Sequence, residues 1–201
     1  MTIAIAGNPN CGKTVIFNAL TGSRQKVGNW SGVTVDRKQG SFHDQGNDYT
    51  LIDLPGVYAL HTTAQDTSID ERIACEYLLS GDVDLIVNVV DASNLERHLY
   101  LSAQLIEMNI PMIIALNMTD VAKRRGLTIN VEALSKQLGC PVIPLVANRH
   151  RGLSLLRQAI ATQQQPPKAI DYPLDPSIKT ALNTLAAALP QQNASWLALR
   201  L

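Results

Sequence analysis

The stretch that decides the fold of this chain is Gly7-Asn8-Pro9-Asn10-Cys11-Gly12-Lys13-Thr14. It fits G-x-x-x-x-G-K-[ST], a pattern in which the backbone N–H groups of a glycine loop and a helix start bind phosphate. The apolar residues 2–6 predict a buried strand before the loop, and residues 14–20 predict a helix after it. We therefore expect Lys13 to contact the β- and γ-phosphates and the Thr14 hydroxyl to ligate Mg²⁺. The alternative is a chance match on a glycine turn of another α/β protein.

The composition narrows the class of protein. The 201 residues carry no formal net charge, which indicates neither a polyanion-binding surface nor a nucleic-acid partner. Charged residues make up 17%, below the roughly 25% of typical soluble domains, so we expect more protein to cover part of the surface. Cys11, Cys75 and Cys140 lie far apart and indicate reduced thiols in a cytosolic protein. The start lacks the basic segment of a signal peptide, and no window is long enough for a membrane span, so we expect a soluble fragment.

Strands and helices alternate along the rest of the chain. We expect strands at 37–42, 48–53, 84–90, 110–116 and 141–146, and helices at 68–79, 95–108, 131–138 and 153–161. The two strands before residue 54 flank turn residues and predict an antiparallel hairpin, whereas residues 21–35 have the composition of a mobile loop. The pattern predicts an α/β fold of the P-loop NTPase type, with a mostly parallel six-stranded sheet flanked by helices.

The composition changes at the Gln/Pro run of residues 162–167, which is a candidate linker. Beyond it, residues 177–188 and 194–201 predict two short helices. We therefore predict two domains, a nucleotide-binding domain over 1–165 and part of an α-helical domain over 166–201.

The candidate partners of the P-loop follow the ends of strands, where ligands bind in open α/β sheets. In Asp53-Leu54-Pro55-Gly56, the carboxylate can hold Mg²⁺ through water and the Gly56 N–H can meet the γ-phosphate. Asn117-Met118-Thr119-Asp120 matches a guanine-reading motif, in which Asp120 accepts from N1–H and the exocyclic amine of guanine and Asn117 ties the loop to the P-loop. The alternatives are a plain strand-ending turn for the first motif and a helix N-cap by Thr119 or Asp120 for the second.

Two further stretches complete the predicted site. Val146-Ala147-Asn148 stands where a backbone N–H meets guanine O6, although a plain loop is the alternative. Gly32-Val33-Thr34-Val35-Asp36 is the candidate switch I, with Thr34 as a second Mg²⁺ ligand, and residues 53–56 form the candidate switch II. The order of these elements predicts a guanine-nucleotide hydrolase in which Lys13, Thr34 and Gly56 are the catalytic groups.

Two residues bear on the rate of hydrolysis. Val57 stands where Ras-like proteins carry the Gln that orients the attacking water, so we expect slow intrinsic turnover. Asn10 is typical of GTPases that K⁺ stimulates, and the carbonyls of Gly28, Asn29 and Trp30 would complete a K⁺ site with it. The alternative is that Asn10 only shapes the loop.

Together these residues resemble the N-terminal cytosolic G domain of the bacterial ferrous iron transporter B family (FeoB). The stretches that carry the resemblance are 7–14, 25–35, 53–58, 88–97, 115–120 and 138–144, and Val27-Gly28-Asn29-Trp30 is the most specific. The resemblance implies a Ras-like G domain, then the start of a helical spacer that inhibits nucleotide dissociation, and a membrane region outside this chain that moves Fe²⁺.

The resemblance also implies a function. GTP binding and slow, K⁺-stimulated hydrolysis with Mg²⁺ would power or gate Fe²⁺ uptake at the cytoplasmic face of the bacterial inner membrane. The implied partners are GTP and GDP, the transporter's own membrane domain, small cytosolic Feo proteins and a second copy of the chain. Cys11 departs from the family's frequent Ser, and we expect its side chain to face solvent or switch I. The alternatives are a soluble GTPase of the TrmE-Era type that acts on RNA or the ribosome, and a binding module in which turnover is incidental.

Overall fold

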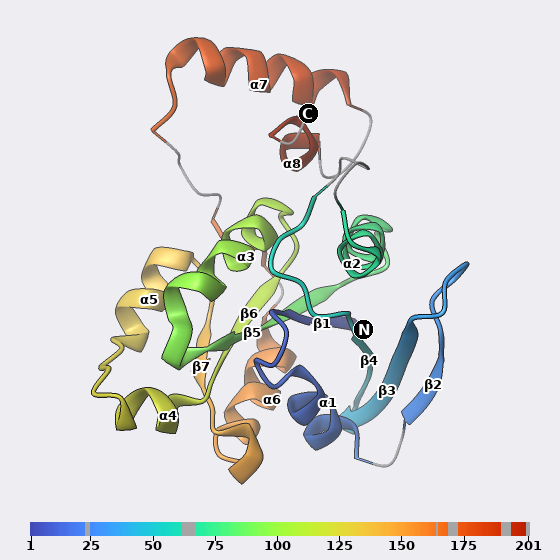
Figure 1. The fold of residues 1–201 in the computed structure, drawn as a ribbon, viewed down its shortest axis with the longest axis vertical. Coiled ribbons are helices and arrows are strands. Elements are labelled where there is room, and N and C mark those ends of the chain that lie inside the picture. The colour runs from blue at the N-terminus through green and yellow to red at the C-terminus, as the bar shows by residue number, and fades with distance from the viewer. Residues whose placement is uncertain (23–24, 62–66, 164, 169–172, 190–193, 200–201) are drawn as a thin grey trace.

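The strands of the described residues form one sheet in the order β2-β3-β4-β1-β5-β6-β7 (Figure 1). The computed structural model describes residues 1–22, 25–61, 67–163, 165–168, 173–189 and 194–199. The strands are β1 Thr2–Gly7, β2 Gln25–Asn29, β3 Asp36–Asp44, β4 Asn47–Asp53, β5 Leu85–Asp91, β6 Met112–Asn117 and β7 Val142–Pro144. Strands β4, β1, β5, β6 and β7 are parallel, so their carboxyl ends meet at one edge of the sheet. That edge is where ligands bind in open α/β sheets.

Helices cover both faces of the sheet (Figure 1). They are α1 Lys13–Thr21, α2 Ile69–Leu79, α3 Leu95–Glu107, α4 Thr119–Arg124, α5 Val131–Leu138, α6 Leu153–Thr162, α7 Pro176–Ala188 and α8 Ala194–Ala198. Successive residues of β1 point to opposite faces, as the pleat of a strand requires. Ile3 and Ile5 pack in the core with α1 and α6, whereas Ala4 and Ala6 belong to the core beneath α2 and α3. The predicted α/β fold with a mostly parallel sheet is confirmed.

The predicted number of six strands is wrong, because residues 25–29 form strand β2 and not a loop. β2 pairs antiparallel with β3 at the edge of the sheet, and β3 pairs antiparallel with β4 as the predicted hairpin. All five residues of β2 are exposed, and Val27 keeps 66% of its surface in solvent. Because β2 has no buried face, its sequence has no alternation of apolar and polar residues from which a strand could be predicted. Only its backbone pairing with β3 identifies it as a strand.

The carboxyl-terminal helices α7 and α8 pack on each other, and α8 also contacts α3 (Figure 1). Trp196 of α8 is fully buried in the same core cluster as α2 and α3. Every described side chain of α7 is at least partly exposed. Within the described residues, no helix combines the length and the apolarity that crossing a membrane requires. The division into domains at residue 165 stays a prediction.

Candidate nucleotide-binding site

The P-loop joins the carboxyl end of β1 to the first turn of α1, as the sequence predicts. Lys13 is 8% exposed, and its ammonium group donates hydrogen bonds of 3.0 Å to the carbonyls of Gly7 and Asn8. Gly12 has a φ of +98°, and a Cβ there would lie 2.4 Å from the Asn117 amide nitrogen. Only glycine fits this position, because it tolerates the left-handed backbone and leaves room for the neighbouring loop.

The Asn117 side chain joins three loops of the site. Its amide nitrogen donates to the Cys11 carbonyl, and its amide oxygen accepts from the Ala147 N–H, both over 3.0 Å. Asn117 is 4% exposed, so neither bond competes with bulk water. The P-loop, the loop after β6 and the loop after β7 are therefore held in one fixed arrangement. The predicted tie between Asn117 and the P-loop is present.

A cavity of about 300 Å³ opens beside this tie. Its lining comprises Gly12, Val15, Asn117, Met118, Asp120, Val121, Arg124, Ala147 and Asn148. The Asp120 carboxylate lies 3.4 Å from Arg124, one helical turn further on. Two residues of the predicted guanine site do not line the cavity. The Thr119 hydroxyl donates to the Leu145 carbonyl, and buried Val146 exchanges backbone hydrogen bonds with Arg151.

A second cavity, of about 610 Å³, lies between the P-loop and the loops before β3 and after β4. Its lining comprises Pro9, Asn10, Lys13, Thr14, Thr34, Val35, Asp36, Lys38, Asp53, Leu54, Pro55, Gly56 and Asp70. The predicted magnesium ligands Thr14, Thr34 and Asp53 thus face one space. Sequence reasoning missed Lys38, which is paired with Asp53 across β3 and β4. It also missed Asp70, from the first turn of α2, because neither residue adjoins a motif.

The carboxylate of Asp53 fits a magnesium site. Asp53 is 8% exposed, and its Oδ2 accepts from the Thr14 hydroxyl over 3.2 Å. Its Oδ1 is buried and has no hydrogen-bond partner among the described residues. Burial raises the pKa of this carboxyl, and the charge of Lys13 offsets only part of the effect. A buried carboxylate oxygen without a partner, beside a hydroxyl, suits a hard cation that prefers oxygen ligands.

The larger cavity does not bring the predicted potassium ligands together. Asn10 lines the larger cavity, whereas Gly28, Asn29 and Trp30 are not among the described residues that do. Gly28 pairs with Arg37 in the β2–β3 ladder, and the Trp30 carbonyl accepts from the Val33 N–H. The Trp30 ring is buried at the edge of Tyr77, with the Arg37 guanidinium 5.1 Å above it. The potassium site therefore stays a prediction that needs segment 28–30 to approach Asn10.

The prediction that the Cys11 side chain faces solvent or switch I is wrong. The burial of Val57, in contrast, agrees with the expectation that its side chain does not orient the attacking water. Cys11 is 1% exposed and packs with Ile16 and Phe17 in the core instead of facing solvent or switch I. Burial raises the pKa of its thiol. Val57 is also buried, and its N–H donates to the Gly7 carbonyl over 3.3 Å. Its side chain therefore points into the core and cannot hold a water at the phosphate.

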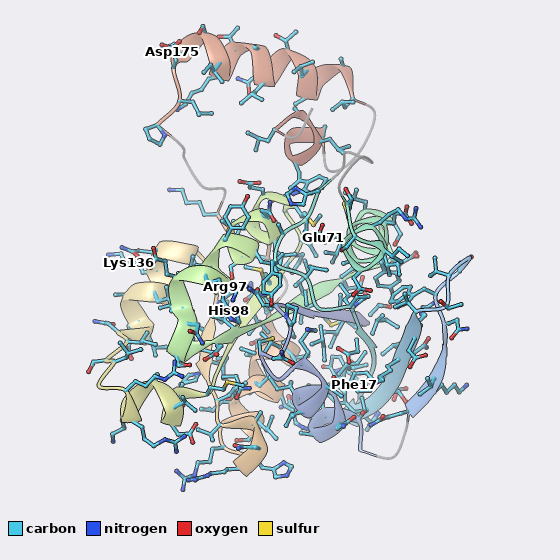
Figure 2. All side chains as sticks on the ribbon, viewed as in Figure 1. Phe17, Glu71, Arg97, His98, Lys136 and Asp175 are labelled. Atoms are coloured by element: carbon cyan, nitrogen blue, oxygen red, sulfur yellow. The ribbon has the colours of Figure 1, made fainter. Side chains whose placement is uncertain are left out.

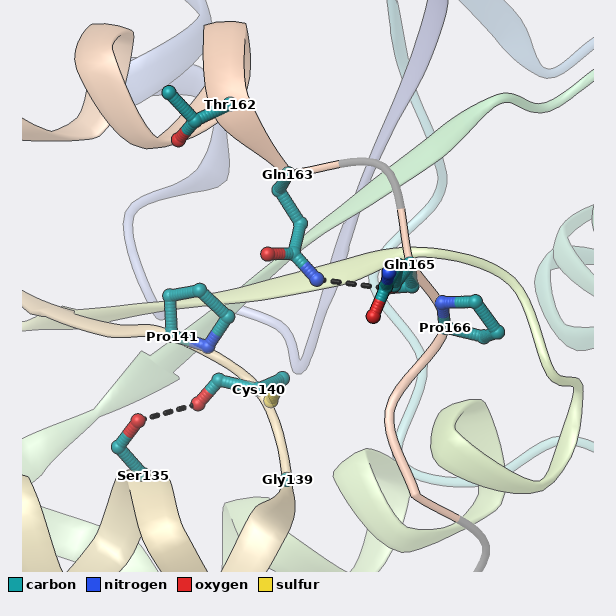
Figure 3. Close-up of a pocket in the computed structure, with 8 residues that line it drawn as sticks. All are labelled: Ser135, Gly139, Cys140, Pro141, Thr162, Gln163, Gln165 and Pro166. Carbon is teal, nitrogen blue, oxygen red and sulfur yellow. Dashed lines mark hydrogen bonds between the residues drawn. The ribbon is translucent and has the colours of Figure 1, made fainter.

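A further cavity, of about 550 Å³, lies near the start of β7 (Figure 3). Gln163 donates to the Gln165 carbonyl at one side, and Ser135 donates to the Cys140 carbonyl at the other. The described residues that line it carry no charge, and burial raises the pKa of the Cys140 thiol to about 12. None of the predicted site residues lies in this cavity, which is at the amino end of its strand and away from the P-loop.

The fold and the two loop-lined cavities define a Ras-like G domain of the P-loop class. The model of the family described as ferrous iron transport protein B matches residues 1–160. The chain is 50% identical to the Fe(2+) transporter FeoB of Escherichia coli K12 over all of its length, but it covers 26% of that relative. This chain belongs to the ferrous iron transport protein B family.

Solved structures agree with this membership. The cytosolic domain of Legionella pneumophila FeoB superposes with a TM-score of 0.96 at 41% identity, covering 100% of this chain and 88% of that one. The cytosolic domain of the Thermotoga maritima FeoB iron transporter in its GMPPNP form gives 0.87 at 36% identity, covering 99% and 79%. These matches support the resemblance over a soluble GTPase that acts on RNA.

Proposed function

We propose that this chain is the GTP-binding and slowly hydrolysing domain of a ferrous iron transporter, and that its nucleotide state powers or gates Fe²⁺ uptake. The observation that carries the proposal is Asp120, whose carboxylate lines a cavity that Asn117 ties to the P-loop. The GMPPNP form of the T. maritima relative supports a triphosphate ligand. Because the chain spans about a quarter of the E. coli relative, transport itself is assigned to the rest of the protein.

The proposed roles follow from the position of each group. Residues 7–14 bind the phosphates through backbone N–H groups and Lys13, and Gly56 donates its N–H to the γ-phosphate. Thr14, Thr34 and Asp53 would hold Mg²⁺, which when bound offsets the negative charge of the phosphate oxygens. Water attacks the γ-phosphorus, and the bond to the β–γ bridging oxygen breaks to release GDP and phosphate. With Val57 buried, no side chain at that position orients the water, so turnover is slow.

Calorimetry tests this function. GTP and GDP are expected to bind with Kd values of about 1 μM, and ATP at least about 100-fold more weakly, because adenine lacks the donor pair that Asp120 accepts. Release of phosphate from GTP separates a hydrolase from a binding module. Equal affinity for ATP and GTP, or no binding of either, would contradict the proposal.

Potassium is the proposed activator. In KCl the GTPase rate is expected to exceed that in NaCl by about tenfold, because a cation beside the phosphates offsets the charge that an arginine finger offsets elsewhere. Asn10→Ala should abolish this difference and leave the rate in NaCl unchanged, because in this proposal the Asn10 oxygen binds K⁺ and not Na⁺. Phosphate release by both proteins in both salts is the measurement. A wild-type rate that is equal in the two salts would rule the activator out.

Removing the Asp53 charge should raise the stability of the nucleotide-free protein and lower the stability of the protein with Mg²⁺·GTP bound. The nucleotide-free Asp53→Asn variant is expected to be more stable by about 1 kcal/mol, because a buried, incompletely paired carboxylate costs free energy. The stabilisation that Mg²⁺ adds to the GTP complex should disappear in the same variant. Thermal unfolding with and without Mg²⁺·GTP measures both. A variant that still gains full stability from Mg²⁺ would show that Asp53 does not hold the metal.

We also propose a domain context, partners and a cellular location for this chain. Residues 166–201 would begin a helical spacer that slows nucleotide dissociation, and the partners would be the membrane domain, small cytosolic Feo proteins and a second copy. The place of action would be the cytoplasmic face of the bacterial inner membrane. Among the described residues, no group of three or more His, Cys, Asp or Glu side chains is arranged to hold a metal ion, and the proposed Mg²⁺ site has one carboxylate and two hydroxyls instead. With no net charge on the chain, we propose no nucleic-acid partner, and a gel shift with ribosomal RNA tests this.

A further inference from the structure

Helix α3 clamps the backbone of the segment that follows switch II. The Gln104 side chain is 7% exposed, and its Oε1 accepts from the Leu60 N–H over 2.8 Å. Its Nε2 donates to the Leu60 carbonyl over 3.4 Å. One amide side chain thus satisfies both backbone polar groups of a single loop residue, as a neighbouring strand would. Because a buried backbone group without a partner is costly, this clamp resists displacement of Leu60.

Two further contacts hold the same segment. The Arg97 guanidinium, also on α3, lies 4.3 Å from the centre of the Tyr58 ring (Figure 2 labels Arg97). The Val57 N–H donates to the Gly7 carbonyl at the end of β1. The Leu60 side chain is 1% exposed in the core that α3 covers. Residues 57–60 are therefore fixed between the P-loop and α3.

Gly56, the residue before this segment, is close to the P-loop. A Cβ on Gly56 would lie 2.8 Å from the Lys13 ammonium nitrogen and 3.0 Å from the Pro9 Cα. The backbone of Gly56 thus lies beside the ammonium group that would meet the same phosphate. Small displacements of the following residues would move the Gly56 N–H relative to Lys13, and catalytic donors lose their effect when misplaced by about 1 Å.

We propose that Gln104 is a positioning residue, which holds Leu60 so that the Gly56 N–H is aimed at the γ-phosphate. This inference rests on the proposed GTPase function. The inference predicts that a change at Gln104 affects the affinity for GTP or GMPPNP but not the affinity for GDP, because GDP has no γ-phosphate and makes no contact that depends on Gly56. A Gln104 that merely stabilised the fold would affect GDP and the triphosphate alike.

The test compares four variants. Gln104→Met keeps the length of the side chain and removes both hydrogen bonds, whereas Gln104→Glu keeps the acceptor for the Leu60 N–H. Arg97→Gln removes the cation over Tyr58 from an exposed position and should fold normally. Tyr100→Ala, also on α3 and 59% exposed, is the control. Calorimetry gives Kd for GDP and GMPPNP, and steady-state assays give kcat and KM for GTP.

Gln104→Met is expected to lose about tenfold in GMPPNP affinity and in kcat, with GDP affinity unchanged. Gln104→Glu should recover part of the loss as the pH is lowered, because the protonated carboxyl can both accept from the Leu60 N–H and donate to the Leu60 carbonyl. Arg97→Gln should lose about twofold to fivefold in the same selective way, and Tyr100→Ala nothing. A parallel loss for GDP and GMPPNP, or no loss in a folded variant, would overturn the inference. If Gln104→Met does not fold, an unchanged GMPPNP-to-GDP ratio in Arg97→Gln overturns it. Wild-type protein that binds neither nucleotide would instead refute the proposed function.

Discussion

Replacing Asp120 by alanine is expected to lower the affinity for GTP and GDP by about 100- to 1,000-fold, because it leaves two donors of a bound guanine without an acceptor. Asp120 lines the smaller cavity, and among the described residues its carboxylate has only the weak 3.4 Å contact with Arg124 to give up. ATP affinity should stay unchanged, so the ratio between the two purines measures the loss. Calorimetry with GTP, GDP and ATP on both proteins provides it.

Two controls accompany this experiment. Asp120→Asn replaces an acceptor by a donor, so it should favour xanthine, whose C2 carbonyl accepts where guanine carries an amine. Arg124→Gln keeps the Asp120 carboxylate and should leave guanine affinity within about threefold, as expected for an exposed ion pair. If Asp120→Ala bound GTP as tightly as the wild type, the base would lie elsewhere and the guanine assignment would be wrong.

Replacing Asn117 by alanine is expected to weaken every nucleotide and the fold itself. The change leaves the Cys11 carbonyl and the Ala147 N–H without their partner, and each unmet buried group costs about 1–3 kcal/mol. The expected loss in free energy of unfolding is therefore about 2–5 kcal/mol. GTP, GDP and ATP should all bind more weakly, because the phosphate and base loops lose their fixed arrangement.

Urea unfolding of the nucleotide-free proteins measures the first effect and calorimetry the second. Asn130→Ala is the matched control, since the exposed Asn130 side chain caps α5 by accepting from the Ala133 N–H. Its loss should cost about 1 kcal/mol and leave nucleotide affinity unchanged. An Asn117→Ala variant as stable as Asn130→Ala would show that the buried bridge contributes little.

Residues whose role depends on local backbone geometry can be predicted from the sequence, whereas residues whose role depends on tertiary contacts are harder to predict. The stretch 7–14, the run from Asp53 to Gly56 and the run from Asn117 to Asp120 each contain their own turn or helix start, and each begins at the carboxyl end of a strand, as the sequence predicts. The position of Gln104 in the sequence does contain a signal for its buried contact. It lies between Leu101 and Leu105 on the inward face of α3, where a polar side chain needs a buried partner.

The amino-acid sequence by itself determined the P-loop, the order of the strand ends and the family, because these depend on short-range spacing and on backbone conformations that few residues adopt. The tertiary structure alone decided that β2 joins the sheet, that Cys11 turns into the core and that α3 holds Leu60. Those features depend on partners far away in the chain, such as Leu60 and Gln104, which are 44 positions apart. Burial and pairing over that distance are set only when the chain has packed.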